Sequence, residues 1–397
     1  MRCRTVVGLL AAWLVVLQAA PAVAGVQDLE VGGRFIQDWT VWGEVDEALG
    51  VSSEDATEVR SAYVSAKGRL GSHLRFKADY DVAGGEVGVK DVYLEAFGVP
   101  GVGHVRVGHW VVPAGLDNIV STKNLSFLES GSCMAFAPGR NTGLMVWNSF
   151  ADGRVTAELG AFRDVNDVAE AEGSGEGGSV AGRLTGLLVN QDGGRRLVHL
   201  AVSGIVWDPK GDAVRFRARP ELHQADYFVD TGSMDAESAR MVGLEIGGVV
   251  GPAHFQGEHL MANVKAREGD GTATGRAALQ DDAGFSGYSV QAGYFLTGES
   301  RGYKGTSFDR TKVTRELLDG GGWGAWEVLA RYSRLDLNGE NAGVAGGRMD
   351  NITFGLSWYL SSYAKVMANY VMATVTDQDG EEVGKATALA TRMQFDF

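Results

Sequence analysis

The chain ends on Met393-Gln394-Phe395-Asp396-Phe397, where apolar and polar side chains alternate. Successive side chains of a β-strand point to opposite faces, so this spacing gives one terminal strand an apolar face and a polar face. A soluble protein rarely ends on an amphipathic strand with no polar tail.

The same alternation recurs along most of the chain. Residues 74–80 place leucine, phenylalanine, alanine and tyrosine on one face and arginine, lysine and aspartate on the other. A soluble β-sandwich would also alternate, so the pattern alone does not decide the fold class. Runs of this kind predict sixteen strands, at residues 30–45, 58–70, 72–83, 89–98, 103–111, 141–150, 154–163, 179–190, 196–207, 239–250, 252–264, 284–298, 323–335, 349–360, 363–374 and 389–397.

Composition favours one large all-β structure. The 397 residues include 57 Gly, about twice the usual share, but only 7 Pro and 2 Cys. A mean hydropathy of -0.07 excludes a bundle of membrane helices, since each helix would need about 20 mostly apolar residues. Two Cys exclude a disulfide scaffold and a cysteine-based zinc module. The net charge is -14, and the chain shows no excess of Lys and Arg of the kind that binds nucleic acid, so we expect no nucleic-acid partner.

Residues 1–24 have the features of a secretory signal peptide. Arg2 and Arg4 give a positive start, residues 5–17 form a nearly continuous apolar run, and residues 22–24 supply the small A-x-A pattern. The apolar run is too short for a membrane anchor, and no positive stop-transfer cluster follows it. We therefore expect export of a single domain over residues 25–397, in which Cys133 has no cysteine partner.

Together these features predict a sixteen-stranded antiparallel transmembrane β-barrel. The C-terminal strand is similar to that of bacterial outer-membrane barrels, and an even number of strands returns the chain to the side where it began. Short turns alternate with longer polar segments, as expected for periplasmic turns and outer loops. Two outer loops, 112–140 and 208–238, are long. Segment 299–322 is also long, although it falls on the side of the short turns.

A barrel of this size implies a channel. Sixteen strands leave an aqueous lumen, whereas eight leave an interior that side chains fill. Polar side chains opposite the apolar face would line the lumen, and a dry core would make their charges costly, so we expect water around them. They are Arg75, Lys77 and Arg106 on the wall, with the acidic residues Asp79, Glu158 and Glu245.

An ordered set of segments resembles the phosphate-selective porin family, which includes the phosphate and polyphosphate porins of outer membranes. Each segment is weak alone, but the set runs through most of the predicted domain in the family's order. The segments are 91–95, 105–110, 113–117, 125–129, 136–140, 215–221, 228–232, 296–301, 324–333, 355–360 and 369–370.

This resemblance implies an integral protein of the Gram-negative outer membrane, in contact with its lipid and assembled as a homotrimer with three separate pores. It also implies that the third and fifth outer loops fold inward as constriction loops, and the two long loops are the third and fifth in order. The implied function is passive diffusion of small hydrophilic solutes, anions such as phosphate among them. No cofactor, metal or catalytic residue is expected.

The candidate pore residues lie in these two loops. Lys123 and Arg140 belong to the third loop, where a fixed positive charge at a narrow point would attract anions. Arg215, Arg217 and Arg219 fall at alternate positions, so an extended segment would gather them into a positive stripe. The planar guanidinium suits phosphate oxygens. Each could instead be a solvated surface charge, or pair with an acidic neighbour.

Alternatives to a phosphate channel remain open. Val111 stands where the family typically has Lys, and Arg140 is followed by Asn141 rather than by a second basic residue. A general or cation-preferring porin is therefore the alternative within this class. Outside it are a barrel enzyme such as a lipase, which would need a Ser/His pair that the sequence does not place, and a structural or adhesion barrel with a blocked lumen.

Overall fold

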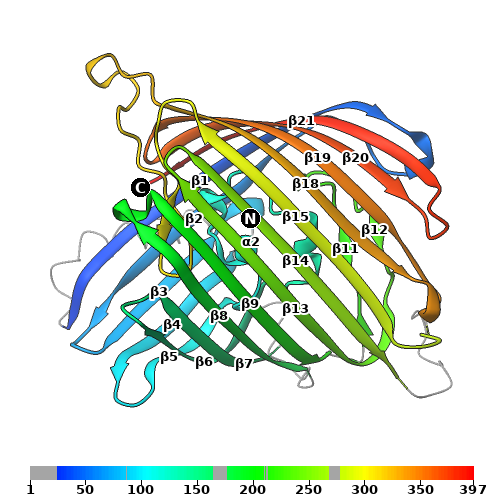
Figure 1. The fold of residues 1–397 in the computed structure, drawn as a ribbon, viewed down its shortest axis with the longest axis horizontal. Coiled ribbons are helices and arrows are strands. Elements are labelled where there is room, and N and C mark those ends of the chain that lie inside the picture. Colours follow the sequence, from blue (N-terminus) through cyan, green and yellow to red (C-terminus); the bar gives the residue numbers. More distant parts are fainter. Residues whose placement is uncertain (1–24, 86, 164–176, 210, 212, 268–277) are drawn as a thin grey trace.

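The computed structural model describes residues 25–85, 87–163, 177–209, 211, 213–267 and 278–397. Over these ranges, sixteen long antiparallel strands form one closed barrel (Figure 1). Both the fold class and the number of strands are as the sequence predicts. The predicted signal peptide, residues 1–24, lies outside the described residues, so it stays a prediction.

The barrel strands follow one another in chain order. They are β1 (Val26–Val45), β2 (Ala56–Leu70), β3 (Leu74–Asp81), β4 (Gly88–Val99), β5 (Gly103–Val111), β6 (Arg140–Phe150), β7 (Val155–Arg163), β8 (Gly178–Gln191), β9 (Arg196–Asp208), β13 (Met234–Val250), β14 (Ala253–Ala266), β15 (Ala283–Phe295), β18 (Ala325–Gly339), β19 (Val344–Ser361), β20 (Ala364–Thr376) and β21 (Glu382–Asp396).

The first and last strands close the barrel. β1 pairs with β21 in a register that runs from Arg34 opposite Asp396 to Val45 opposite Ala386. Closure leaves no unpaired sheet edge, so backbone polar groups are satisfied within the wall. At one end, short turns such as Gly251-Pro252 join the strands, and Gly251 adopts a positive φ of 58° that favours glycine. We call this the short-turn end, and the opposite end the long-loop end.

Several strands are longer than predicted at the long-loop end. β13 begins at Met234 rather than at residue 239, β19 at Val344 rather than at 349, and β21 at Glu382 rather than at 389. The added residues include Glu237, Arg348 and Lys385, which interrupt the apolar alternation on which the prediction relied. Backbone pairing with a neighbour continues the strand beyond the point where side-chain pattern identifies it.

The outward face of the wall is apolar. Leu159, Val206, Val290 and Phe354 come from four different strands, and each is more than half exposed. A soluble protein rarely exposes apolar surface over so many strands, whereas a bilayer-facing barrel must do so. Among the described residues, no helix is long and apolar enough to span a bilayer.

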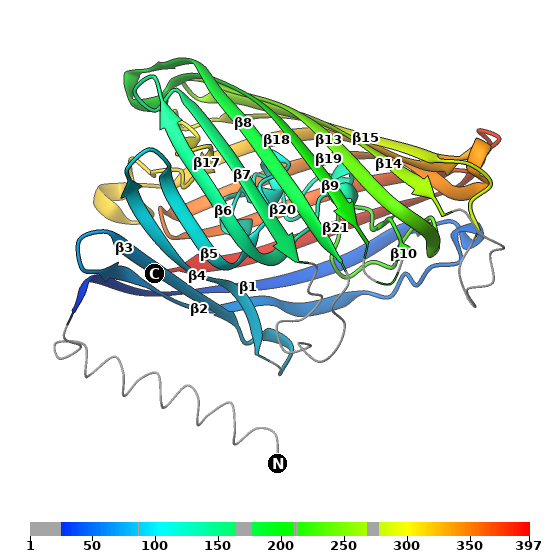
Figure 2. The same ribbon diagram turned by 90° about the horizontal axis from the view of Figure 1, so that it is seen from below.

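Three segments enter the lumen, as Figure 2 helps to show. The third loop, residues 112–139, carries α2 (Leu116–Ile119) and two 3-10 turns, η4 (Thr122–Asn124) and η5 (Ser132–Phe136). The fifth loop, residues 209–233, carries the short strands β10 (Ala213–Val214), β11 (Arg217–Ala218) and β12 (Val229–Asp230). The inserted hairpin, β16 (Gly302–Lys304) with β17 (Ser307–Asp309), comes from the short-turn end. The other 3-10 turns among the described residues are η2 (Glu47–Leu49), η3 (Ala83–Gly85), η6 (Asp192–Gly194), η8 (Asp319–Gly321) and η9 (Glu340–Ala342).

Side chains of these insertions fill one side of the lumen and exclude water from it. Phe216 of the fifth loop lies between Phe136 of the third loop and Phe285 of β15, with ring centroids 5.0 and 5.7 Å apart.

The expectation that Glu245 faces water is wrong. It is 4% exposed, because the inserted hairpin covers this wall, and it pairs with Arg183 at 2.6 Å.

Candidate functional site

The open part of the lumen follows the other side of the barrel. A cavity of ≈ 1580 Å³ runs along inner residues of β1 to β8. Residues 118–124 of the third loop and residues 303–307 of the inserted hairpin also line it. The insertions thus narrow the passage from both ends of the barrel. This cavity is the candidate solute path.

Basic side chains outnumber acidic ones among the described residues that line this cavity. The nine basic residues are Arg34, Lys67, Arg75, Lys77, Arg106, Lys123, Arg140, Lys304 and Arg310. The six acidic residues are Glu30, Asp79, Asp91, Glu158, Asp309 and Asp396. The excess gives the cavity a positive field, which low-dielectric walls strengthen.

The three wall cations predicted from sequence all line the cavity, and all are paired. Arg75 Nε and Arg106 Nε donate to the two oxygens of Glu95 at 2.6 and 2.7 Å. Lys77 Nζ lies 2.8 Å from carboxylate oxygens of both Asp79 and Asp91. Strand alternation explains why they face inward, whereas the pairing depends on neighbouring strands.

Arg140 and Lys123 also line the cavity, although Arg140 is the first residue of β6 and not, as predicted, part of the third loop. Arg140 Nε donates to Asp91 at 2.7 Å, so Asp91 neutralises part of two cations. Lys123 Nζ donates to Asp396 at 2.6 Å. Burial lowers the pKa of Lys123, while Asp396 opposes that shift.

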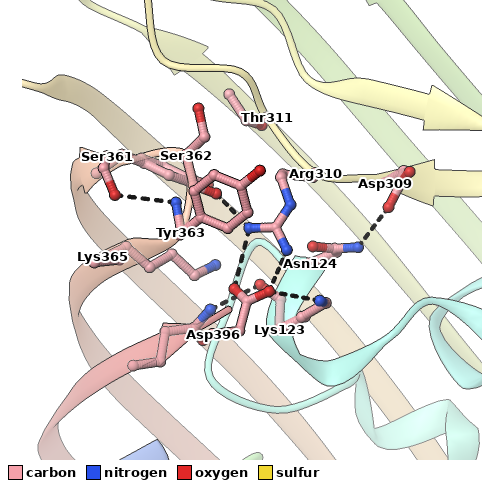
Figure 3. Close-up of a pocket in the computed structure, with 13 residues that line it drawn as sticks. Lys123, Asn124, Asp309, Arg310, Thr311, Ser361, Ser362, Tyr363, Lys365 and Asp396 are labelled. Carbon is pink, nitrogen blue, oxygen red and sulfur yellow. Dashed lines mark hydrogen bonds and ion pairs between the residues drawn. The ribbon is translucent and has the colours of Figure 1, made fainter. Parts of the chain in front are cut away.

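Asp396 links two of the inserted segments, as Figure 3 shows. Its carboxylate accepts hydrogen bonds from Lys123 of the third loop and from Arg310, which follows the inserted hairpin. Beside it, Asn124 Nδ2 donates to Asp309 Oδ1 at 2.8 Å. The end of β21 therefore joins the third loop to the segment that carries the inserted hairpin.

Arg34 is a pore-lining cation that sequence reasoning missed. Its guanidinium lies 3.9 Å from the centroid of the Tyr63 ring, and Nη1 donates to Ser121 Oγ at 3.2 Å. No described carboxylate lies within ion-pair distance of it. Arg34 and Phe35 are neighbours in β1, so their side chains point to opposite faces of the wall, and the sequence could have identified Arg34 as an inward cation. The sequence could not have shown that Arg34 lies close to the third loop.

The fifth-loop arginines share one face, as the alternate spacing predicts. Val214, Phe216 and Ala218 between them are buried. Arg215 Nε donates to Asp230 at 2.8 Å, and the guanidinium groups of Arg217 and Arg219 lie 3.9 and 4.6 Å from the centroid of the Tyr227 ring. None of the three lines the cavity described above. Their role in selectivity stays a prediction.

Buried carboxylates fix both loops to the wall. Glu129 of the third loop accepts from Arg60 Nε at 2.8 Å and from Arg392 Nη2 at 2.9 Å. Burial alone would raise the pKa of Glu129, but the two arginines lower it to about 2. Glu221 of the fifth loop pairs with buried Arg331 and accepts from Thr353 Oγ1 at 3.0 Å.

Cys133 packs inside the same dry region. It is fully buried, with Sγ 3.6 Å from Ser289 Oγ. Burial raises its pKa well above the usual value, so the side chain stays a thiol. Within η5 of the third loop it serves as a small packing residue.

Comparison with known proteins agrees with this geometry. The family model described as phosphate-selective porin O and P matches residues 30–397. An uncharacterized protein of Caulobacter vibrioides is 27% identical over 379 residues, covering 89% of this chain and 70% of that protein. Porin O of Pseudomonas aeruginosa is 23% identical over 411 residues, covering 93% and 88%.

A solved structure has the same fold. The anion-selective porin from Comamonas acidovorans matches with a TM-score of 0.55 and 13% identity, over 93% of this chain and 99% of that one. Family and fold point to a channel rather than to an enzyme. The chain belongs to the phosphate-selective porin O and P family, and it is an integral porin of the outer membrane.

Proposed function

We propose that this porin lets small hydrophilic anions, phosphate among them, diffuse passively through the cavity between β1–β8 and the third loop. The excess of basic side chains along the cavity supports an anion preference. Cations at a narrow point raise the local concentration of anions and oppose the entry of cations. The name of the family supports phosphate as one of the solutes.

Arg34 is the single observation that carries this proposal. Most other cations along the path share a carboxylate, whereas Arg34 keeps its full charge beside Ser121. The Arg34 residue is 9% exposed, and its Nε is buried without a hydrogen-bond acceptor among the described residues. Arg34 lines the cavity, and the fork geometry of its guanidinium suits the oxygens of a phosphate.

Ion selectivity in planar bilayers tests the proposal. The reversal potential in a KCl gradient should show chloride preference, and added phosphate should reduce the chloride current by occupying the path. Arg34→Gln should lower the chloride-to-potassium permeability ratio about 15-fold, since a unit charge about 5 Å away contributes ~0.8 kcal/mol to each ion even in bulk water, with opposite signs for chloride and potassium. It should also weaken the reduction by phosphate.

The alternative is a general or cation-preferring porin. Six acidic residues line the same cavity, and most of its cations are paired. A reversal potential of the opposite sign would support that alternative. A triple variant with Arg215, Arg217 and Arg219 all changed to Ala tests the fifth-loop stripe separately. An unchanged reversal potential in that variant would remove these residues from the selectivity pathway.

A homotrimer is the second part of the proposal. Tyr63, Ser65 and Lys67 of β2 line the cavity, so the alternate residues Ala62, Val64 and Ala66 face outward. Small outward side chains allow a close approach of a neighbouring subunit, as cyclic symmetry requires. Ala62→Cys should form cross-linked dimers on mild oxidation, because Ala62 is partly exposed. The same change at Leu159, on the outward face of β7, serves as the comparison and should not cross-link.

A further inference from the structure

Three buried polar side chains meet on the wall opposite the solute path. Gln256 and Glu258 lie on the inner face of β14, and Asp117 lies in α2 of the third loop. All three are almost fully buried. None of them lines the cavity. Buried polar groups must be hydrogen-bonded to be tolerated, so their partners define what they do.

Glu258 holds the start of α2. Its Oε2 accepts the backbone N–H of Leu116 at 2.5 Å, and its Oε1 accepts that of Asp117 at 3.0 Å. The first N–H groups of a helix have no partner within the helix, so an external acceptor fixes them. The next residue, Asn118, begins the stretch 118–124 that lines the cavity.

Gln256 joins the contact between Glu258 and α2 to the segment that carries the inserted hairpin. Its Nε2 donates to Asp117 Oδ1 at 2.6 Å and to Glu258 Oε1 at 2.8 Å. Its Oε1 accepts from Arg301 Nη1 at 3.1 Å. The guanidinium of Arg301 in turn lies 3.7 Å from the ring centroid of Phe308 in the inserted hairpin.

Asp117 extends the network to the far arm of the third loop. Its Oδ2 accepts the N–H of Gly131 at 3.1 Å. The start of α2, the return arm of the loop and the base of the inserted hairpin thus depend on one amide and one carboxylate of β14. Removing either would leave donors or acceptors unsatisfied in a buried site.

We propose that Gln256 and Glu258 are positioning residues for ion selectivity, although they do not touch the solute. They set where residues 118–124 and the inserted hairpin stand in the lumen, and so fix the width and charge of the path. This proposal rests on the proposed function, because it assigns how the constriction of that same channel is held.

Two matched substitutions test the proposal. Gln256→Met keeps the length of the side chain but removes both the donors and the acceptor. Gln291→Met is the control, because Gln291 lies directly opposite Gln256 on β15, is also buried, and forms no side-chain hydrogen bond with any described residue. Single-channel conductance and reversal potential are measured for both, with folding checked by circular dichroism and by heat-modified mobility on gels.

We expect Gln256→Met to change conductance at least about twofold, to add sub-conductance levels and to shift the reversal potential. Gln291→Met should match the wild type. Glu258→Gln should act in the same direction as Gln256→Met, because an amide offers only one acceptor oxygen to two N–H groups. Folded Gln256→Met and Glu258→Gln channels with wild-type conductance and selectivity would overturn the proposal.

Hydrogen exchange on the wild-type protein keeps the proposal testable if the variants do not fold. The amides of Leu116, Asp117 and Gly131 should exchange slowly, and fast exchange at these three positions would overturn it. Failure of the proposed function is a separate result, because it would appear as absent anion preference in the wild type. Failure of the positioning role would appear as equality between the variants and the wild type.

Discussion

Changing Arg392 to methionine is expected to lower the free energy of unfolding by about 3–5 kcal/mol. Arg392 is fully buried on β21. Its Nε and Nη2 donate to the two oxygens of Asp38 at 2.7 and 2.6 Å, and Nη2 also donates to Glu129 at 2.9 Å. Methionine would leave both carboxylates in a largely buried site without this partner, which costs more than the ion pair itself contributes.

Equilibrium unfolding in urea, with the barrel in detergent or lipid vesicles, measures this loss. Arg60→Met is the matched control, because Arg60 binds the same Glu129 but its side chain is 24% exposed. Its removal should cost about 1 kcal/mol or less, as for a partly exposed pair. Equal losses in the two variants would contradict the prediction.

The pH dependence of the Arg392→Met variant gives a further check. The pKa of Glu129 is about 2 in the folded protein, below the value of about 4.3 usual for glutamate. A lowered pKa stabilises the fold above the unfolded value, and this stabilisation is lost as the pH falls through about 2. The difference in stability between wild type and variant should therefore shrink below about pH 5.

Changing Asp396 to asparagine is expected to raise the chloride-to-potassium permeability ratio about 15-fold, since a unit charge about 5 Å from the path contributes ~0.8 kcal/mol to each ion, with opposite signs for chloride and potassium. Asp396 accepts from both Lys123 and Arg310, and all three line the cavity (Figure 3). Asparagine keeps the shape but removes the negative charge, so two cations act on the solute unopposed.

Reversal potentials in a KCl gradient measure this change. Glu30→Gln removes the same charge from the same cavity, but Glu30 and its partner Lys67 are both more than half exposed. Water and salt screen such a pair, so its effect should be smaller. A reversal potential that shifts toward potassium preference in the Asp396→Asn variant would contradict the proposal that Asp396 offsets the charges of Lys123 and Arg310.

The sequence predicted the wall of this protein well. Alternation in runs such as residues 74–80 placed Arg75 and Lys77 inward, and the structure places both on the cavity. This signal is local, because neighbouring side chains of a strand always point to opposite faces. Strand ends were less predictable, since β21 begins at Glu382, seven residues before the apolar pattern that predicted it.

The resemblance to a family placed the third and fifth loops inside the barrel, and the length of segment 299–322 was visible as an anomaly. Nothing in that segment's composition indicated that β16 and β17 would enter the lumen. The hairpin is held by contacts such as Arg183 Nη2 with the carbonyl of Thr306, which join residues 123 positions apart. Such contacts have no counterpart in local sequence.

The sequence by itself determined the number of strands and their polar inner faces, because a period of two is fixed residue by residue along each strand. The closed barrel followed once the amphipathic last strand and the even strand count were added to that alternation. Only the tertiary structure decided which cations along the cavity are paired with a carboxylate. Lys123 meets Asp396 across 273 positions, whereas Arg34 meets no described carboxylate. Charge pairing depends on where three inserted segments come to rest after the ring of strands has closed, and no spacing along the chain records that position.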